Sequence, residues 1–239
     1  PADDGIGGAF LEKGTFYGVG VGPGDPELIT LKAVRAIERC PVIAAPETRG
    51  EKTLALDIAR GVVDLTGKTI LRMQFLMTRD KQALEESHRR QARQIMEHLD
   101  AGRDVAMLNL GDVSIYSTFS YILEIVLEQG YRAEVVAGVP SFCAVAALLQ
   151  QSLTEMSHPL HIIPAGHGSL EENLALPGTK VLMKTGKALP QVREALRRQG
   201  LYEKASLVQN CGLPTQVVCH SLDEARDDIG YFTTIVVKE

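Results

Sequence analysis

Apolar residues recur along the first 150 residues in two alternating patterns. Short apolar runs, which are typical of buried strands, are followed by segments with apolar residues every three or four positions, which predict helices. In the clearest helical segment Leu84, Ala92, Ile95 and Leu99 share one face, and Gly102 ends it. The pattern predicts strands at 15–20, 42–45, 69–73, 105–110 and 133–137, and helices at 31–40, 53–62, 80–101, 118–128 and 141–150, the last with Ser141 as its N-cap.

The pattern changes after about residue 150, where strands outnumber helices. Strands are predicted at 160–164, 180–184, 206–209, 217–220 and 232–237, with one clear helix at 189–198. Strand–helix alternation predicts a mainly parallel sheet in the first part, and the excess of strands predicts a mixed sheet in the second. We therefore expect two α/β domains: a flexible N-terminal tail over 1–13, an N-terminal domain over 14–140 and a C-terminal domain over 141–239.

Composition and charge narrow the classes of function. The 239 residues carry a net charge of -5, so bulk electrostatics give no support for nucleic-acid binding. No apolar run approaches the roughly 20 residues of a membrane span, and residues 1–14 lack the basic and apolar regions of a signal peptide. We expect a cytoplasmic protein with no membrane or nucleic-acid partner.

The cysteines and histidines do not form a metal-binding pattern. The four cysteines are far apart and include no C-x-x-C pair, which argues against a zinc site or a disulfide framework. Cys40 and Cys143 lie among apolar residues and are expected to fill the core. His158, His161 and His167 are close in sequence, but no acidic or cysteine partner stands at ligand spacing. We expect no protein-bound metal.

The segment GVGVGPGDPELIT, residues 18–30, looks like a phosphate-binding glycine loop. The dinucleotide pattern G-x-G-x-x-G fails in all three registers, and the P-loop pattern fails from every glycine. Asp25 and Glu27 would also face a phosphate group. A second candidate, GVVDLTGKT at 61–69, has five residues between its glycines where a P-loop has four, and it precedes a predicted strand.

Two interpretations of the first glycine segment stay open. It is either a tight strand-to-helix turn with Pro26 near the helix entrance, or a stretch where missing side chains let a ligand approach the backbone. Its position after the first strand of a parallel sheet favours the ligand, because open α/β sheets bind ligands at that edge.

Two further turns follow predicted strands and reach the same edge. The segment NLGDVSIYSTFSY, 109–121, carries many hydroxyl groups, which Ser117 or Thr118 as an N-cap would partly explain. Asp112 suits a ligand hydroxyl or ammonium group. The third turn is AGVPS, 137–141. Three converging turns with one acidic and few basic residues suit a neutral or cationic cofactor better than a phosphorylated one.

These segments resemble a known family. VGVGPGDPELITLKA, 19–33, resembles the N-terminal motif of the tetrapyrrole (corrin and sirohaem) methyltransferases, which use S-adenosylmethionine, and the order of the three turns matches that family from about Thr15. PETRGEKTLALDIA (46–59), FLMTRDKQAL (75–84), LGDVSIYSTFSY (110–121) and YFTTIVVK (231–238) resemble the branch that methylates C20 of precorrin-2 or cobalt-factor II. Within that branch, the sequence STFSY (117–121) favours the cobalt-containing substrate.

The resemblance implies a homodimer and a cofactor cleft between the two domains, with the cofactor held largely by backbone. The residues that it assigns to the cofactor are Pro23, Gly111, Asp112, Val113, Ile115, Tyr116, Pro140, Ser141, Phe142, Met183, Cys211 or Gly212, and Thr233 or Thr234. One departure is Val113, which stands where the family has a proline. This turn loses a fixed φ and gains an N–H, and we expect cofactor binding to survive because the position mainly offers backbone.

The implied reaction is an in-line transfer of a methyl group from the sulfonium to C20 of the macrocycle, driven mainly by proximity and orientation. Asp25, Tyr17 and Tyr116 are candidates for the base that removes the C20 proton, with ligand positioning as the alternative role. Any cobalt would arrive within the substrate. The basic residues that could hold the substrate carboxylates, if they are not simply solvated, are Arg49, Lys52, Arg72, Arg79, Lys184 and Lys187.

Three alternatives remain at this stage. A member of the same family could methylate another macrocycle carbon. A nucleotide-dependent enzyme could use the glycine segment, although the failed registers argue against it. A non-catalytic tetrapyrrole carrier would bind the macrocycle without methylating it.

Overall fold

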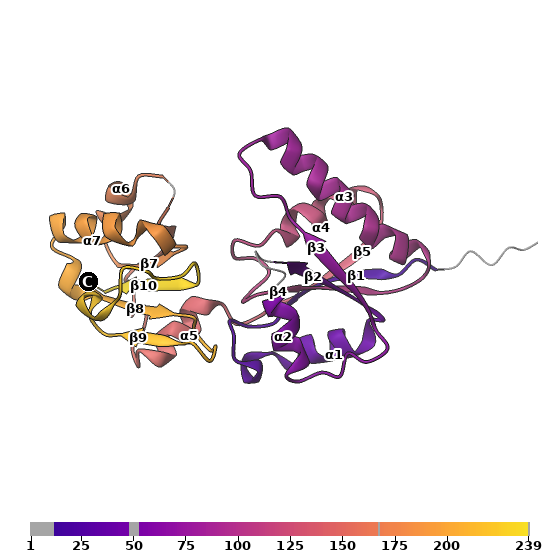
Figure 1. The fold of residues 1–239 in the computed structure, drawn as a ribbon, viewed down its shortest axis with the longest axis horizontal. Helices are drawn as coiled ribbons and strands as arrows, with labels where there is room; N and C mark the ends of the chain where they lie inside the picture. The colour runs from indigo at the N-terminus through magenta and orange to yellow at the C-terminus, as the bar shows by residue number, and fades with distance from the viewer. Residues whose placement is uncertain (1–11, 48–52, 167, 239) are drawn as a thin grey trace, which may run out of the picture. The chain divides into compact units, whose positions relative to one another are not determined.

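The structure, a computed structural model, describes residues 12–47, 53–166 and 168–238 (Figure 1). The chain divides into two compact units. The first unit comprises Pro1–Val21 and Ile29–Gly138, and the second comprises Gly22–Leu28 and Val139–Glu239. The short segment Gly22–Leu28 therefore belongs to the second unit, although it directly follows the first strand. Of the tail expected over 1–13, only Glu12 and Lys13 are described.

The first unit is built on a five-stranded sheet in which every strand is parallel to its neighbours. The strand order is β3-β2-β4-β1-β5, which places β1 between β4 and β5. The parallel sheet predicted from the sequence is thus confirmed. The strands are β1 (Thr15–Gly20), β2 (Val42–Glu47), β3 (Thr69–Gln74), β4 (Val105–Asn109) and β5 (Arg132–Val136).

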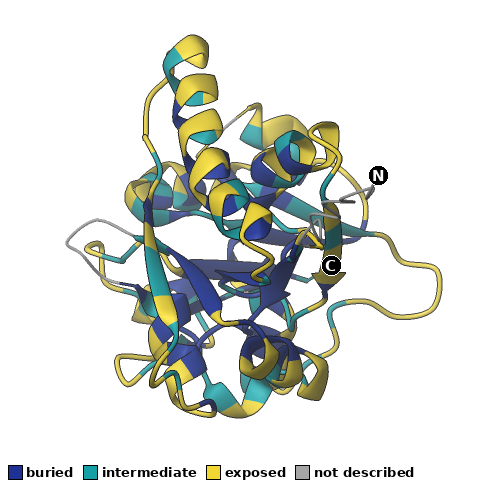
Figure 2. Ribbon diagram, turned by 90° about the vertical axis from the view of Figure 1, so that its right-hand side faces the viewer, coloured by how far each residue is buried: buried dark blue, intermediate teal, exposed yellow. Residues whose placement is uncertain are grey.

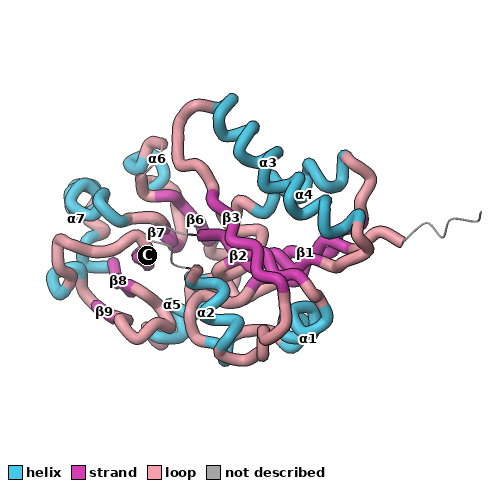
Figure 3. The backbone as a smooth tube through the Cα atoms, turned by 45° about the vertical axis from the view of Figure 1, so that its right-hand side comes forward, coloured by secondary structure: helices cyan, strands magenta, loops and turns pink. Residues whose placement is uncertain are grey.

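Helices cover both faces of this sheet, as Figures 1 and 3 show. The first pair, α1 (Leu31–Arg39) and α2 (Leu54–Arg60), packs its apolar residues on one face. The other pair, α3 (Lys81–Asp100) and α4 (Phe119–Glu128), packs on the opposite face. Local chemistry fixes two of the starts: the Thr30 side chain accepts from the Ala33 N–H, and the Asp80 side chain accepts from the N–H groups of Gln82 and Ala83.

The second unit contains a mixed sheet, as the sequence predicted. Its order is β6-β7-β10-β8-β9, with β6 and β7 parallel and the other pairs antiparallel. Its strands are β6 (Leu160–Pro164), β7 (Thr179–Met183), β8 (Ala205–Gln209), β9 (Val217–Cys219) and β10 (Thr233–Val237). The helices are α5 (Ser141–Leu148), α6 (Leu170–Leu174) and α7 (Leu189–Arg198), with short 3-10 turns at Pro26–Leu28, Gly186–Ala188, Tyr202–Lys204 and Leu222–Glu224.

Several local predictions were wrong. Ser141 is the first residue of α5 and not its N-cap, because Pro140 occupies that position and provides no side-chain bond. Helix α6 was missed, since its five residues are too few to show a helical period. Cys40 is buried as expected, but Cys143 is exposed because it lies on the outer side of α5.

Buried residues lie on the strands and on parts of the helices, as the burial colouring of Figure 2 shows. In the first unit, β2 and β4 are buried along most of their length, as expected for strands with helices on both faces. Among the described residues, no helix is long and apolar enough to span a membrane.

Candidate functional site

The three turns at the carboxyl edge of the first sheet touch one another through backbone. Gly20 pairs with Asn109 in the parallel ladder, and the Val21 N–H donates to the Asn109 carbonyl at 2.9 Å. A methyl group on Gly20 would lie 2.7 Å from the Gly111 carbonyl oxygen, and one on Gly138 would lie 2.2 Å from the same oxygen. Real Cβ atoms do not approach so closely, so these positions require glycine. The predicted convergence of three strand ends is confirmed.

This junction lies where open α/β sheets bind ligands. The strands β1 and β4 are neighbours, yet α1 follows β1 onto one face and α4 follows β4 onto the other. The chain therefore leaves two adjacent strands in opposite directions, and the carboxyl ends of such a strand pair are where open α/β sheets bind ligands.

Asp112 ties the second turn to the third. Its carboxylate accepts the Gly138 N–H at 2.7 Å and the Ser114 N–H at 2.9 Å, and it also accepts the Ser114 hydroxyl. Burial alone would raise the pKa of this carboxyl, but hydrogen bonds from Ser114, Gly138 and Val113 outweigh it, so the pKa lies below its usual value. Asp112 is thus held ionised, and part of its hydrogen-bonding capacity goes to shaping the turns.

A second polar chain supports the same turn. The Phe119 N–H donates to the Ser117 hydroxyl at 3.1 Å, and that hydroxyl donates to the buried Asn109 side chain at 2.7 Å. Thr118 occupies the N-cap position but makes no side-chain cap bond, so of the two proposed capping residues Ser117 supplies the interaction. Asn109 was not among the site residues predicted from the sequence, although a polar residue at the end of a buried apolar strand can indicate such a role.

The rest of this segment has a strained backbone. Tyr116 adopts φ +50°, a region that costs a residue with a side chain about 1–2 kcal/mol. Its ring is exposed at 44%, and partial burial of its hydroxyl raises the pKa. Val113, by contrast, packs into the core of the α3 and α4 face, and Ile115 is half-buried.

In the second unit, the first glycine segment packs against the turn after β8. A methyl group on Gly24 would lie 2.4 Å from the Cys211 carbonyl oxygen, and one on Gly212 would lie 2.4 Å from the Asp25 nitrogen. Pro23 is buried within this contact region. The structure therefore brings Pro23, Cys211 and Gly212 together, although they are far apart in the sequence.

The same edge of the second sheet carries the other expected cofactor residues of this unit. Thr233 pairs with Gln209, and Ile235, two residues later, pairs with Leu182, which precedes Met183. Thr233 is buried and its hydroxyl donates to the Gly230 carbonyl at 2.8 Å. The buried Thr234 lies between Thr233 and Ile235 in β10.

Three residues with side chains adopt the left-handed backbone beside expected site positions. Tyr116 is one of them, Lys184 follows Met183 with φ +56°, and Asn210 precedes Cys211 with φ +52°. Strain of this kind persists where the surrounding structure fixes it, which is common at ligand sites. Near Lys184, the buried Thr185 hydroxyl has no hydrogen-bond partner among the described residues.

The side chains of Cys211 and Asp25 have different environments. Burial, with a contribution from the negative charge of Asp25, raises the pKa of the Cys211 thiol to about 11, so it is protonated at neutral pH. Asp25 is half-buried, and its side chain accepts the Glu27 N–H at 2.9 Å. This hydrogen bond uses one carboxylate oxygen of Asp25, and the other oxygen takes no part in it.

The third turn leads into α5. Pro140 and Ser141 are half-buried, and Phe142 is buried. Further along, Ala144 and Val145 pack with Val208 and Cys211 in one cluster, which anchors α5 to the second sheet.

Tyr17 lies apart from the turns. It is in the middle of β1, three residues before Gly20, and is only 5% exposed. The Arg39 guanidinium lies over its ring at 4.6 Å, on the α1 face of the sheet. Within the first unit, Tyr17 is therefore separate from the turn after β4 that carries Tyr116.

The candidate basic residues are distributed over both units. Arg72 is on β3, where it pairs with Glu47 at 3.4 Å, and Arg79 is exposed just before α3. In the second unit, Lys184 directly follows β7, and burial lowers its pKa, while Lys187 lies in the 3-10 turn that follows. Arg49 and Lys52 are outside the described residues.

Within 12–47, 53–166 and 168–238, no three His, Cys, Asp or Glu side chains are grouped so that they could hold a metal ion. His161 instead contacts the Pro177 carbonyl oxygen at 2.9 Å.

Comparison with known proteins agrees with the resemblance in these segments. The curated protein of Methanocaldococcus jannaschii named probable cobalt-precorrin-2 C(20)-methyltransferase is 34% identical over 195 residues, which is 81% of this chain and 76% of that protein. The Salmonella typhimurium cobalt-precorrin-2 C(20)-methyltransferase is 31% identical and covers 95% of this chain and 97% of its own length.

A solved structure has the same fold. It is the uroporphyrin-III C-methyl transferase from Thermus thermophilus complexed with S-adenyl homocysteine, which covers 95% of this chain and 92% of its own with a TM-score of 0.69 at 22% identity. The family model described as tetrapyrrole (corrin/porphyrin) methylases matches residues 15–225. The chain therefore belongs to the tetrapyrrole (corrin/porphyrin) methylases.

Proposed function

We propose that this chain transfers a methyl group from S-adenosylmethionine to C20 of a corrin precursor in cobalamin biosynthesis. Cobalt-factor II is the favoured acceptor, and precorrin-2 is the alternative. The observation that carries the proposal is the similarity over 95% of the chain to a relative whose name specifies cobalt-precorrin-2 and C(20). The convergence of the three turns at the carboxyl edge of the first sheet supports it, since that edge is where such sheets bind ligands.

The residues present suit the cofactor, which when bound supplies an electrophilic methyl group on a sulfonium. In the first unit, the turn around Asp112 would bind the methionine and ribose part, and its fixed carboxylate suits a hydroxyl or ammonium group. In the second unit, the unpartnered Thr185 hydroxyl near Met183 suits a polar ring such as adenine. The proposed contacts are Pro23, Gly111, Asp112, Val113, Ile115, Tyr116, Pro140, Ser141, Phe142, Met183, Cys211, Gly212, Thr233 and Thr234.

Among the three candidate bases we assign the proton acceptor to Asp25. The acceptor carbon must lose its proton when it gains the methyl group, so a group that can bind a proton is needed. Burial raises the pKa of both Tyr116 and Tyr17, so their hydroxyls stay protonated and can only donate or position at neutral pH. Asp25 has a carboxylate oxygen outside its local hydrogen bond.

The substrate carboxylates need cations, and here the described candidates differ. Arg79 is exposed with no ion pair among the described residues, whereas Arg72 already pairs with Glu47. We therefore propose Arg79 ahead of Arg72, with Lys184, Lys187, Arg49 and Lys52 as further candidates. We also propose that the chain acts in the cytoplasm as a homodimer, which light scattering of the purified protein would test.

Two measurements test the proposal. Calorimetry should show binding of S-adenosylhomocysteine, and failure to bind would refute it. An assay with cobalt-factor II and precorrin-2 side by side shows which of the two gains one methyl group. NMR of the product should place that methyl group at C20. A methyl group on another carbon would favour a different member of the family.

The Asp25 assignment has its own test. The change Asp25→Asn keeps an oxygen that can accept the Glu27 N–H, so the turn should survive. We expect kcat to fall about 100-fold while S-adenosylhomocysteine affinity is retained. An unchanged kcat would return Asp25 to a positioning role.

A nucleotide-dependent enzyme is the alternative from another class. The space beside Gly24 is filled by the backbone of Cys211 and Gly212, so this glycine serves contact within the protein. Thermal stabilisation by NAD or ATP, but not by the adenosyl ligand, would revive that alternative. Tight macrocycle binding without methylation would instead indicate a carrier.

A further inference from the structure

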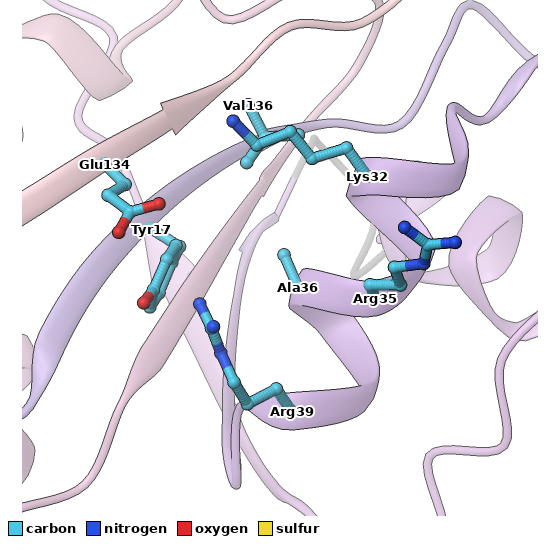
Figure 4. A pocket seen from close by; sticks show the side chains of 7 residues that line it. All are labelled: Tyr17, Lys32, Arg35, Ala36, Arg39, Glu134 and Val136. Atoms are coloured by element: carbon cyan, nitrogen blue, oxygen red, sulfur yellow. The ribbon is translucent and has the colours of Figure 1, made fainter.

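A small cavity lies on the α1 face of the first sheet. It has a volume of about 130 Å³ and is lined by residues of α1, β1 and β5 (Figure 4). Since one water molecule takes up roughly 30 Å³, the cavity has room for about four water molecules. That space fits a small ion but is far too small for a macrocycle. None of the proposed cofactor or substrate residues lines it, and Tyr17 is the one candidate base that does.

The sequence places three cations along one side of this cavity. Lys32, Arg35 and Arg39 stand at positions i, i+3 and i+7 of α1, so they share one face of the helix. Ala36 is buried between them, and its small side chain leaves the space open. Across from the helix, Tyr17 pairs with Glu134 in neighbouring parallel strands, so their side chains project on the same face.

These charges are not neutralised within the described part of the protein. Lys32, Arg35 and Arg39 form no ion pair there, and neither does Glu134. Three cations and one carboxylate leave an excess positive charge in a chain whose net charge is -5. Like charges on one helix face repel one another, and an anion bound among them would relieve the repulsion.

The orientations in Figure 4 distinguish the three cations. Arg39 reaches toward Tyr17, in keeping with the 4.6 Å separation between its guanidinium and the ring. Lys32 extends toward Val136, whereas Arg35 points away from Tyr17. The Tyr17 hydroxyl, protonated at neutral pH, adds a donor on the floor of the cavity.

We propose that this cavity is a second binding site, for a small dianion of the phosphate or short dicarboxylate class, held by Lys32 and Arg39 with the Tyr17 hydroxyl as a further donor. Bound there, the anion links α1 to β1. Because α1 follows directly on the first glycine segment, occupancy stabilises the helix that begins there.

The test uses the full chain and two probes, inorganic phosphate and succinate, with potassium chloride at equal ionic strength as reference. Both probes should raise the melting temperature more than chloride does, and calorimetry should give their Kd. In the variant K32Q/R39Q the affinity should fall by tenfold or more. The control R35Q removes one positive charge from the same helix, where K32Q/R39Q removes two, and should weaken binding only about twofold; K32Q and R39Q alone, each matched to R35Q in charge, should each weaken it more.

The variant E134Q removes the nearby negative charge and should tighten binding of both probes. The proposal is overturned if chloride raises the melting temperature as much as the probes do. It is also overturned if K32Q/R39Q keeps the affinity for the probes, or if E134Q lowers it. A melt without anion shows that K32Q/R39Q is folded. The outcome is separate from that of the proposed function, because S-adenosylhomocysteine binding and methylation use other residues and should persist in K32Q/R39Q.

Discussion

Glycines bring distant backbone segments into contact within each unit, but the strained residues with side chains beside those contacts differ between the units: Tyr116 in the first, Lys184 and Asn210 in the second. In the first, the turns meet at Gly20, Gly111 and Gly138, where missing side chains make room. In the second, Gly24 meets the turn after β8, but the adjoining bends at Lys184 and Asn210 use residues with side chains at positive φ.

The difference distinguishes residues that only shape the backbone from residues whose side chains could contact a ligand. A glycine at a bend removes strain and contributes only shape. A lysine or tyrosine in the same conformation costs about 1–2 kcal/mol. We therefore interpret the first-unit junction as a rigid frame, and we expect a ligand role only at the strained residues that stand at or beside proposed site positions, Tyr116, Lys184 and Asn210.

The largest expected effect is on the frame. In Gly138→Ala the new methyl would meet the Gly111 carbonyl oxygen at 2.2 Å, so the turns must separate. We expect the free energy of unfolding to fall by about 3 kcal/mol, measured by urea titration. Gly130→Ala is the control, because a methyl group there has nothing within 4 Å, and it should lose only about 1 kcal/mol, which comes from the positive φ of Gly130. Equal losses in the two variants would refute the frame.

The corresponding change in the second unit should affect activity more than stability. In Gly24→Ala the methyl would meet the Cys211 carbonyl oxygen at 2.4 Å, so the segment Gly22–Leu28 and the turn after β8 must separate. We expect a stability loss of about 2 kcal/mol and a fall of about 100-fold in kcat/KM, since an ångström of misplacement is costly. Gly166→Ala, whose methyl would have an ordinary 3.9 Å contact, should be close to neutral.

The carboxylate that fastens the frame gives a pH-dependent prediction. Because the pKa of Asp112 is lowered by folding, its stabilisation is present above the unfolded value of about 3.9 and is lost as the pH falls through the lower folded value. Asp112→Asn should therefore lose about 1–2 kcal/mol at pH 7 and less at pH 3. Urea midpoints at both pH values measure this. A difference that does not shrink at pH 3 would contradict it.

Removing backbone strain should raise the free energy of unfolding slightly, whereas the changes above lower it. Lys184→Gly removes a side chain at φ +56°, and Gln150→Gly does the same at φ +53° at the end of α5. We expect each to gain about 0.5 kcal/mol, the strain relieved less the entropy of the added glycine. Only Lys184→Gly should lose kcat/KM, since Gln150 is not a proposed site residue. Equal kinetics in both variants would show that the strain at Lys184 serves no ligand.

The smallest expected effect is on the chemical reactivity of the Cys211 thiol. With a pKa of about 11, roughly one thiol in a thousand is ionised at pH 8, so iodoacetamide should leave it unmodified in the native protein. The exposed Cys143 should react first, and Cys143→Ser identifies its adduct by mass spectrometry. Cys211→Ala should keep cofactor affinity, because the contact with Gly24 uses the backbone.

The sequence predicted most of the secondary structure, since long periodic segments such as α3 and buried apolar strands such as β4 give strong signals. It also predicted that three glycine-containing turns converge. It could not show that Asp112 accepts the Gly138 N–H, because nothing in sequence links residues 26 positions apart. Nor could it place Tyr17, because alternation in a strand does not reveal which helix covers which face.

By itself the sequence determined the parallel and mixed sheets, the edge where ligands are expected and the family resemblance. These follow from local periodicity and from glycines at fixed spacing, which neighbouring residues alone encode. Tertiary structure decided that Gly22–Leu28 packs with the second unit, that Asp112 is a tie between turns, and that Tyr17 faces a basic cavity beside α1. Each of these depends on contacts between distant segments, and only the packed chain brings them within reach.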